Sequence, residues 1–183
     1  MSSTSTGIFF DRDGIVNRRR VDDYVTRWEE FELLDDILDV LPSVHAIGAV
    51  AILVTNQRGI ALGRMTHADL DDIHRRLQRT LQERCGHSFD AIYYCPHGND
   101  DGCTCRKPKP GMIVQGILEF DLDPSRAWMI GDAPSDIEAG RGAGCRTAFV
   151  GEEGEGSRAD IVGRSLRETW VKIERFYVAG REA

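Results

Sequence analysis

Two acidic side chains near the start of the sequence form a candidate catalytic pair. Asp11 and Asp13 come directly after the apolar run GIFF, and residues i and i+2 of an extended chain point to the same side. Gly14 then permits a tight turn away from the pair. A polar loop whose carboxylates cap a turn would explain an isolated pair equally well, so the chemistry depends on the groups that accompany it.

Groups suited to phosphate chemistry follow other apolar runs. Thr55 comes after AVAILV, Asp132 comes after AWMIG, and Arg106-Lys107 supplies cations. This set fits phosphoryl transfer, in which one carboxylate attacks phosphorus and Mg²⁺ is held by carboxylates and the phosphate itself. A Lys and a hydroxyl neutralise the equatorial oxygens. A second carboxylate can protonate the leaving alcohol and later deprotonate the attacking water.

Four soft metal ligands lie within eleven positions, as Cys-x-His followed by Cys-x-Cys: Cys95, His97, Cys103 and Cys105. Zn²⁺ prefers tetrahedral thiolate and imidazole ligands, and Cys₃His is a closed, structural set. Incidental thiols or a disulfide are the alternative. An odd total of five Cys, without a recognisable secretory signal, favours a reducing compartment. We therefore predict a structural zinc loop over residues 95–105, which would stiffen the segment that delivers Arg106 and Lys107.

Short apolar runs that alternate with helical patterns predict the elements that position these groups. The strands are expected at 7–10, 49–54, 90–94, 127–130 and 147–150. Helices are expected at 33–47, 66–83, 111–120, 134–140 and about 164–177. Thr66 is suited to be an N-cap with Asp69 three residues on. The last helix is expected to turn four side chains inward: Leu166, Trp170, Ile173 and Phe176.

This alternation predicts an α/β fold, a three-layer Rossmann-like sandwich with a mainly parallel central sheet, in one domain over residues 1–183. Ligands of such sheets bind outside the carboxyl ends of the strands. Asp11, Thr55, Cys95 and Asp132 all fall at that edge. We therefore expect these chain-distant polar residues to meet in one cleft.

The segments resemble, in order, the four motifs of the haloacid-dehalogenase superfamily of phosphatases, over residues 8 to about 150. The motifs are DRDG after a strand, an apolar strand ending in Thr55, the Lys of Arg106-Lys107-Pro108, and Gly131-Asp132 with Asp136. The resemblance implies that Asp11 is the nucleophile and Asp13 the general acid/base. It also implies that Thr55 binds the phosphoryl group and Lys107 balances its charge.

The same resemblance implies a catalytic Mg²⁺ site. Its ligands would be Asp11, the backbone carbonyl of Asp13, and Asp132, with Asp136 supporting the metal directly or through water. The interval between Asp13 and Thr55 is too short for a large inserted cap domain. We therefore expect a fairly open cleft, with loops selecting the substrate.

The zinc loop narrows the resemblance. The string CPH…C-x-C-RKP-x-PGM over residues 95–112 is similar to the zinc-containing phosphatases that remove the 7-phosphate of D-glycero-D-manno-heptose 1,7-bisphosphate. Histidinol-phosphate phosphatases share the cluster and the Arg-Lys-Pro, whereas Pro-Gly-Met is more typical of the heptose enzymes. The alternatives are a histidinol-phosphate phosphatase or another small phosphomonoesterase, a nucleic-acid 3′-phosphatase, and a non-catalytic phosphosugar-binding zinc module. The presence of Asp11 argues against the last.

A sugar bisphosphate needs cations beyond the catalytic Lys to hold its second phosphate. The candidates are Arg106, Arg58, Arg64 and one of Arg18, Arg19 and Arg20, although a single Arg is more often a solvated surface charge. Asn56 and Gln57 match the phosphate- and sugar-facing loop of the heptose enzymes. Leu62 and Ala133 depart from their pattern, because those enzymes usually carry a cation at both positions, and this puts the choice of substrate in question.

The composition excludes several classes. The chain has 183 residues, with 23 basic and 30 acidic side chains and a net charge of −7, which argues against a general nucleic-acid binder. No apolar stretch approaches the ~20 residues that span a bilayer, and the start lacks the regions of a signal peptide. We expect a cytoplasmic monomer that binds a small phosphorylated sugar and has no nucleic-acid or membrane partner.

Overall fold

A parallel β-sheet forms the centre of the computed structural model, which describes residues 5–21, 23–152 and 158–179. The strands follow the order β3-β2-β1-β4-β5-β6, and each neighbouring pair is parallel. Their bounds are β1 Gly7–Phe10, β2 Val50–Asn56, β3 Ala91–Cys95, β4 Trp128–Gly131, β5 Arg146–Val150 and β6 Ile161–Gly163. A right-handed crossover connects each parallel pair in folds of this class.

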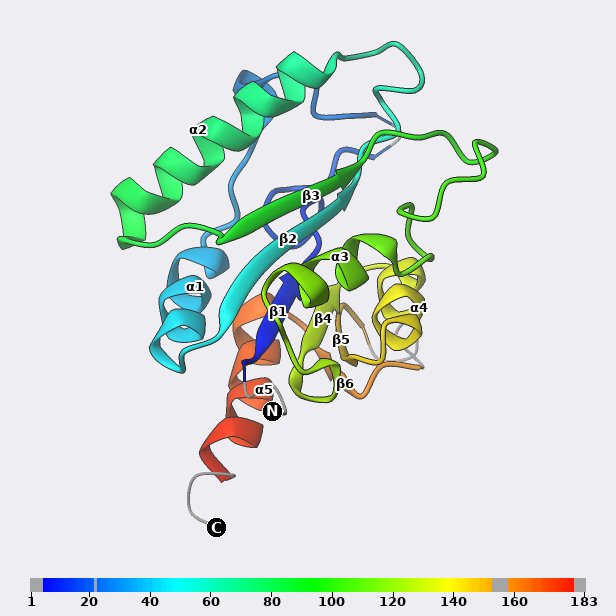
Figure 1. The fold of residues 1–183 in the computed structure, drawn as a ribbon. Coiled ribbons are helices and arrows are strands. Elements are labelled where there is room, and N and C mark those ends of the chain that lie inside the picture. Colours follow the sequence, from blue (N-terminus) through cyan, green and yellow to red (C-terminus); the bar gives the residue numbers. More distant parts are fainter. Residues whose placement is uncertain (1–4, 22, 153–157, 180–183) are drawn as a thin grey trace.

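Helices cover both faces of this sheet, so the fold has the predicted three layers (Figure 1). They are α1 Asp36–Ala46, α2 His67–Cys85, α3 Gly111–Glu119, α4 Pro134–Gly142 and α5 Leu166–Ala179, with 3₁₀ turns at Trp28–Glu30 and Pro124–Arg126. Ile8 and Phe10 of β1 belong to a core shared with α1, α2 and α5. Phe9, between them, belongs to a second core shared with α3 and α4. The alternation of side chains along the strand thus divides the interior.

The predicted strands and helices are confirmed, with shifts at their ends. Thr55 and Asn56 belong to β2 rather than following it. The capping box at Thr66 and Asp69 is present at the start of α2. Helix α1 begins at Asp36 rather than at residue 33, because Leu33 instead forms a bridge with Asn17.

Two features of the C-terminal region differ from the sequence-based expectation. Strand β6 was not predicted, because its three residues are too few to produce a periodic pattern. It pairs with β5 at the edge of the sheet. Phe176 was predicted to face inward, but the residue is 49% exposed. Its ring packs edge-on against the buried Trp128, with centroids 5.2 Å apart, and Arg146 lies over it.

The strand order places the candidate residues at a topological switch point. From β1 the chain passes to β2 and β3 on one side, and later to β4, β5 and β6 on the other. The carboxyl ends of β1, β2 and β4 are therefore neighbours, and such reversals form the ligand crevice of parallel sheets. Between β1 and β2 the described chain contains only loops, one 3₁₀ turn and α1, as expected for a chain without a large cap.

Within the described residues, no helix combines the length and the apolar composition needed to cross a bilayer.

Candidate active site

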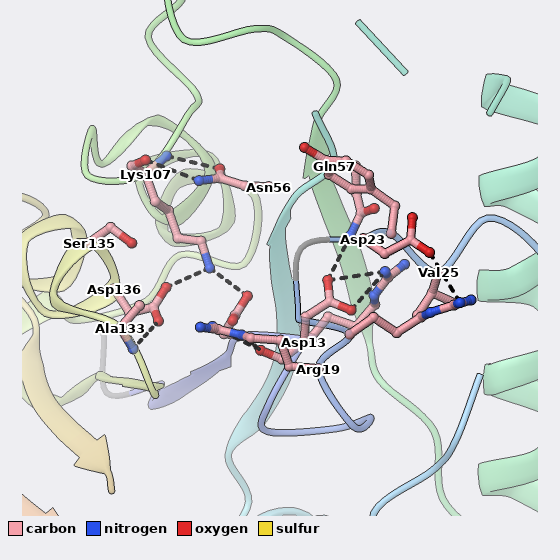
Figure 2. A pocket seen from close by; sticks show the side chains of 14 residues that line it. Asp13, Arg19, Asp23, Val25, Asn56, Gln57, Lys107, Ala133, Ser135 and Asp136 are labelled. Atoms are coloured by element: carbon pink, nitrogen blue, oxygen red, sulfur yellow. Dashed lines mark hydrogen bonds and ion pairs between the residues drawn. The ribbon is translucent and has the colours of Figure 1, made fainter. Parts of the chain in front are cut away.

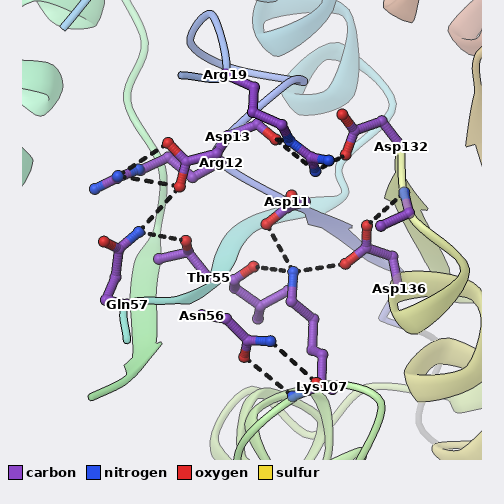
Figure 3. Close-up of polar contacts among 12 residues, drawn as sticks. Asp11, Arg12, Asp13, Arg19, Thr55, Asn56, Gln57, Lys107, Asp132 and Asp136 are labelled. Atoms are coloured by element: carbon purple, nitrogen blue, oxygen red, sulfur yellow. Dashed lines mark hydrogen bonds and ion pairs between the residues drawn. The ribbon is translucent and has the colours of Figure 1, made fainter. Parts of the chain in front are cut away.

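Lys107 joins two carboxylates at the centre of the site (Figure 3). Its Nζ lies 2.6 Å from Asp11 Oδ1 and 2.7 Å from Asp136 Oδ1, and it donates to the carbonyl oxygen of Val54 at 3.0 Å. All three charged side chains are less than 10% exposed. Strand β1 delivers Asp11, helix α4 delivers Asp136, and the loop after the Cys cluster delivers Lys107. The buried ammonium therefore compensates the charge of carboxylates brought from two other parts of the chain.

Burial and mutual repulsion control the ionisation of this centre. Desolvation raises the pKa of Asp11 to about 7, and the charges of Asp136 and Asp13 act in the same direction, against the opposing effect of Lys107. Burial by itself would lower the pKa of Lys107, but the two facing carboxylates outweigh it and raise that pKa. At neutral pH, Lys107 thus stays positively charged, while the Asp11 carboxyl group is close to the midpoint of its titration.

Asp13 turns its carboxylate to the other side, toward donors that hold it in the charged form. Arg12 Nη2 donates to both of its oxygens at 3.0 and 3.1 Å, Asn17 Nδ2 donates at 3.0 Å, and Gln57 Nε2 donates at 3.1 Å. Burial would raise the pKa of Asp13, but the charge of Arg12 and these hydrogen bonds outweigh it and lower that pKa. The Asp13 side chain remains 27% exposed, so it still reaches the cavity.

Arg12 and His74 form a support behind Asp13 that the sequence reasoning missed. Arg12 is only 1% exposed, its Cζ lies 5.9 Å from the centre of the Phe31 ring, and its Nη1 lies 3.4 Å from His74 Nε2. Burial, reinforced by Arg12, lowers the pKa of His74 to about 3, so this imidazole is neutral and can accept from Arg12. The available signal was a His on the apolar face of the predicted helix 66–83.

Thr55, Asn56 and Gln57 leave the end of β2 with distinct partners. Thr55 is fully buried and its Oγ1 accepts from Gln57 Nε2 at 2.8 Å. The Asn56 amide brackets the backbone of Lys107: Oδ1 accepts from its N–H and Nδ2 donates to its carbonyl, both at 3.0 Å. This amide therefore fixes the main chain from which the Lys107 side chain extends.

Asp132 lies at the end of β4 and contacts a loop cation (Figure 3). Arg19 Nη2 lies 2.6 Å from Asp132 Oδ1, and its Nε and Nη2 donate to the backbone carbonyl of Asp13 at 3.2 and 3.1 Å. Burial raises the pKa of Asp132 to about 6, against the lowering effect of Arg19. Gly14 makes the close approach possible: its φ is +105°, and a Cβ there would lie 1.9 Å from Asp132 Oδ2.

The donors at this edge fit a hard divalent cation. Ligand oxygens of Asp11, Asp132 and Asp136 all lie within 4.8 Å of one another. Mg²⁺ takes carboxylate oxygens and usually keeps several waters. The carbonyl of Asp13 faces the same position as Asp132, because the Arg19 guanidinium contacts both. The residues predicted for Mg²⁺ are thus brought together, and their charge calls for a cation.

The Cys cluster is also assembled, and its distances match those of a tetrahedral zinc site. Cys95 Sγ lies 3.7 Å from Cys103 Sγ and 3.5 Å from His97 Nδ1, which lies 3.3 Å from Cys105 Sγ. Tetrahedral bonds of about 2.3 Å to sulfur and 2.0–2.1 Å to nitrogen would separate these ligands by about 3.8 and 3.6 Å. The sulfurs are too far apart for a disulfide, and all the cysteines are free.

A cavity extends from this centre toward Arg19, Arg20 and residues 23–25 (Figure 2). Besides the residues described, Arg20, Tyr24 and Ser135 line it. A neighbouring cavity shares Asn56, Lys107 and Ser135 with it and contains further polar and cationic groups: Asn99, Arg106 and Lys109. The two cavities adjoin at these shared residues, beside the buried centre.

The predicted substrate-binding arginines occupy different places around this space. Arg106 lines the neighbouring cavity and donates to the carbonyl of His97 at 3.4 Å. Arg64 lines neither of these two cavities. Its guanidinium pairs with Asp23 at 3.5 Å and lies over the Tyr24 ring. In the described part of the chain, Arg58 lines neither cavity, and its Nε is buried without a hydrogen-bond partner.

Comparison with known proteins agrees with this fold. Residues 104–173 match the HAD-hydrolase-like family model. The structure is similar to the D,D-heptose 1,7-bisphosphate phosphatase from B. bronchiseptica complexed with magnesium and phosphate, with a TM-score of 0.84 and 32% identity. That similarity covers 93% of this chain and 99% of the other. The chain is therefore a hydrolase of the haloacid-dehalogenase-like class.

Curated relatives define the family within this class. A D-glycero-β-D-manno-heptose-1,7-bisphosphate 7-phosphatase from Helicobacter pylori strain J99 is 39% identical over 143 residues, which are 78% of this chain and 81% of the relative. A D-glycero-α-D-manno-heptose-1,7-bisphosphate 7-phosphatase from Mycobacterium bovis is 35% identical over 172 residues, covering 91% and 90%. The chain belongs to this family of phosphatases. The two relatives differ in the anomer that they are named for.

Proposed function

We propose that this chain removes the 7-phosphate of D-glycero-D-manno-heptose 1,7-bisphosphate through an aspartyl-phosphate intermediate. The observation that carries the proposal is the convergence of Asp11, Lys107 and Asp132 at the carboxyl edge of the sheet, in a chain whose relatives are named for that reaction. The substrate itself is a small phosphorylated sugar.

In the first step, a carboxylate oxygen of Asp11 attacks phosphorus while the bond from phosphorus to the sugar oxygen breaks. Lys107 neutralises charge on the phosphoryl oxygens, and the Thr55 hydroxyl, which already accepts from Gln57, is free to donate to them. Asp13 gives its proton to the leaving alcohol. Asp13 takes up this proton when the substrate binds, because the negative charge of the incoming phosphate raises the pKa of the Asp13 carboxyl group.

In the second step, Asp13 acts as a base. Its carboxylate takes a proton from water, the resulting hydroxide attacks phosphorus, and the bond to the Asp11 oxygen breaks, which releases inorganic phosphate and restores the Asp11 carboxylate. The support of Arg12 and Asn17 stabilises the ionised form that this step requires. The same donors must yield when Asp13 carries a proton.

Both metals have proposed places in this scheme. Asp11, the carbonyl of Asp13, and Asp132 would hold Mg²⁺, with Asp136 in support, and the bound metal would stabilise negative charge on the transferring phosphoryl group. Zn²⁺ would be held by Cys95, His97, Cys103 and Cys105. Because those four donors complete a tetrahedral set, this ion would be structural, and it would fix the loop that carries Lys107.

Cations around the cavities would hold the second phosphate. Arg106 has the best support, because it lines the cavity that adjoins Lys107. Arg64 would act from outside the two cavities, where its guanidinium lies over the Tyr24 ring and pairs with Asp23. Arg58 would need to reorient in order to reach a ligand. Asn56 and Gln57 would contribute by placing Lys107 and Asp13, and could also contact the sugar.

The cellular location and the class of partner are proposed from the cysteine content and the net charge. Five free cysteines favour a reducing compartment, which supports a cytoplasmic location. The negative net charge supports the expectation of no nucleic-acid partner. We further propose that the chain is a monomer of one domain over residues 1–183 and that it has no membrane partner.

Phosphate release across a substrate panel tests this proposal. The panel contains both anomers of heptose 1,7-bisphosphate, histidinol phosphate, fructose 1,6-bisphosphate and a 3′-phosphorylated oligonucleotide. The heptose substrates should give the highest kcat/KM, and Asp11→Asn should abolish turnover while leaving folding and zinc content unchanged. Preference for histidinol phosphate would replace the proposed substrate. Binding of heptose bisphosphate without turnover would instead support a non-catalytic binding module.

A further inference from the structure

Arg19 is the cation of the N-terminal loop that contacts the predicted metal ligands. Its guanidinium bridges the backbone carbonyl of Asp13 and the Asp132 carboxylate, with three nitrogen–oxygen distances between 2.6 and 3.2 Å. The Asp132 side chain is only 18% exposed, whereas that of Arg19 is 47% exposed. The charged end of a half-exposed side chain thus reaches inward to a mostly buried carboxylate (Figure 3).

The neighbouring arginines of the sequence have other partners. Arg18 Nε pairs with Glu32 at 2.8 Å, on the outside of the loop. Arg20 pairs with Asp23 at 3.1 Å and with Glu30 at 2.9 Å. Three consecutive residues of one type therefore differ in what they neutralise. Arg18 and Arg20 neutralise acidic groups of their own loop region, and Arg19 neutralises a carboxylate 113 residues away in the chain.

Geometry makes the Arg19 contact incompatible with full occupation of the metal site. Two of the proposed Mg²⁺ ligands, the carbonyl of Asp13 and the carboxylate of Asp132, accept hydrogen bonds from the same guanidinium. Mg²⁺ needs ligand oxygens at about 2.0–2.1 Å in a near-octahedral arrangement. A guanidinium between those oxygens excludes such an ion, since both would occupy the same space and repel each other.

We infer that Arg19 is a built-in competitor of Mg²⁺, a side chain that neutralises Asp132 before the metal binds and is displaced when it does. This inference rests on the proposed Mg²⁺ site. Displacement moves the guanidinium away from these two oxygens within the cavity that Arg19 already lines, together with Arg20 and Ala133. Metal binding and the position of the loop cation are then coupled, and the affinity for Mg²⁺ is lower than the carboxylates alone would give.

Calorimetric titration of Mg²⁺ into the zinc-loaded protein, without substrate, tests the inference. The variants are Arg19→Gln, with Arg18→Gln and Arg20→Gln as controls that remove the same charge from the same loop. Arg19→Gln should bind Mg²⁺ about five- to tenfold more tightly than the wild type, the range expected when a partly exposed, charge-assisted contact is lost. The controls should change the affinity by less than about twofold, because Arg18 and Arg20 pair with acidic groups other than the predicted metal ligands and screening weakens their longer-range effect.

The outcomes separate this inference from the function on which it rests. Unchanged or weaker Mg²⁺ binding by Arg19→Gln would overturn the competition, and so would an equal gain in all three variants, which would reflect net charge alone. Asp132→Asn should weaken Mg²⁺ binding in the same assay. If the wild type binds no Mg²⁺, the proposed metal site fails and the inference fails with it.

Discussion

The Asn56 amide offers a sharp test of how Lys107 is positioned. Its two hydrogen bonds to the Lys107 backbone are both 3.0 Å long and part-buried, and a typical net hydrogen bond contributes about 1 kcal/mol. Asn56→Ala should therefore lower the free energy of unfolding by about 2 kcal/mol. For a chain of this size, that corresponds to a fall in Tm of roughly 4–8 °C.

The same substitution should affect kcat more than KM. Lys107 would remain in the chain, but its backbone would lose the bracket that aims Nζ at Asp11, and misplacement by about 1 Å can cost 10²-fold in rate. A direct substrate contact by Asn56 would instead raise KM. Asn99→Ala is the matched control, because Asn99 lines the same neighbouring cavity. An Asn56→Ala variant with unchanged Tm and kcat but a raised KM would refute this reasoning.

Three further perturbations test the buried charges and the two metals. Lys107→Met leaves the Asp11 and Asp136 carboxylates buried without their ammonium. Urea unfolding without Mg²⁺ should therefore show that the free energy of unfolding falls by about 3–5 kcal/mol. A fall below about 1 kcal/mol would contradict the buried pairing. Cys103→Ser should release zinc and lower the free energy of unfolding by about 2.7 kcal/mol at zinc hundredfold above Kd, whereas a zinc-free variant of full stability would exclude a structural role. Mg²⁺ needs ionised ligands, and burial raises the pKa of Asp11 to about 7 and that of Asp132 to about 6. Lowering the pH from 8 to 5.5 should therefore protonate both carboxylates and weaken Mg²⁺ binding at least about tenfold. A Kd that calorimetry finds to be independent of pH would contradict the raised pKa values.

Much of the fold could be predicted because the central strands β1, β2 and β4 are buried on both faces. The continuous apolar runs GIFF and AVAILV have that origin, and their ends located Asp11 and Thr55 at the site. Strand β6 carries no such signal, since it is short and lies at the edge of the sheet. Phe176 followed the helical period, but the period cannot tell that Trp128 and Arg146 would cover its ring only in part.

The site divides in a similar way. Groups with chemistry fixed by their side chains, such as Lys107 and the four residues of the Cys cluster, could be picked out from type and spacing, and the structure brings them together. Contacts that depend on which direction a side chain takes were not. The sequence contains no sign that Asn56 would face the Lys107 backbone or that Arg12 would turn back to His74. The choice of Arg19 among three consecutive arginines depends on the loop's path, which spacing does not determine.

Phosphorylation of Asp11 is the step on which the proposed reaction depends, and covalent trapping detects it. During a single turnover of heptose 1,7-bisphosphate, Asp13→Asn should form the intermediate slowly, because it lacks the acid for the first step, and should then accumulate it, because it lacks the base for the second. Borohydride reduces an acyl phosphate to the alcohol, so peptide mass spectrometry should find homoserine at position 11. Reduction at another residue, or no reduced residue in a variant that still releases a stoichiometric amount of the sugar product, would contradict the account.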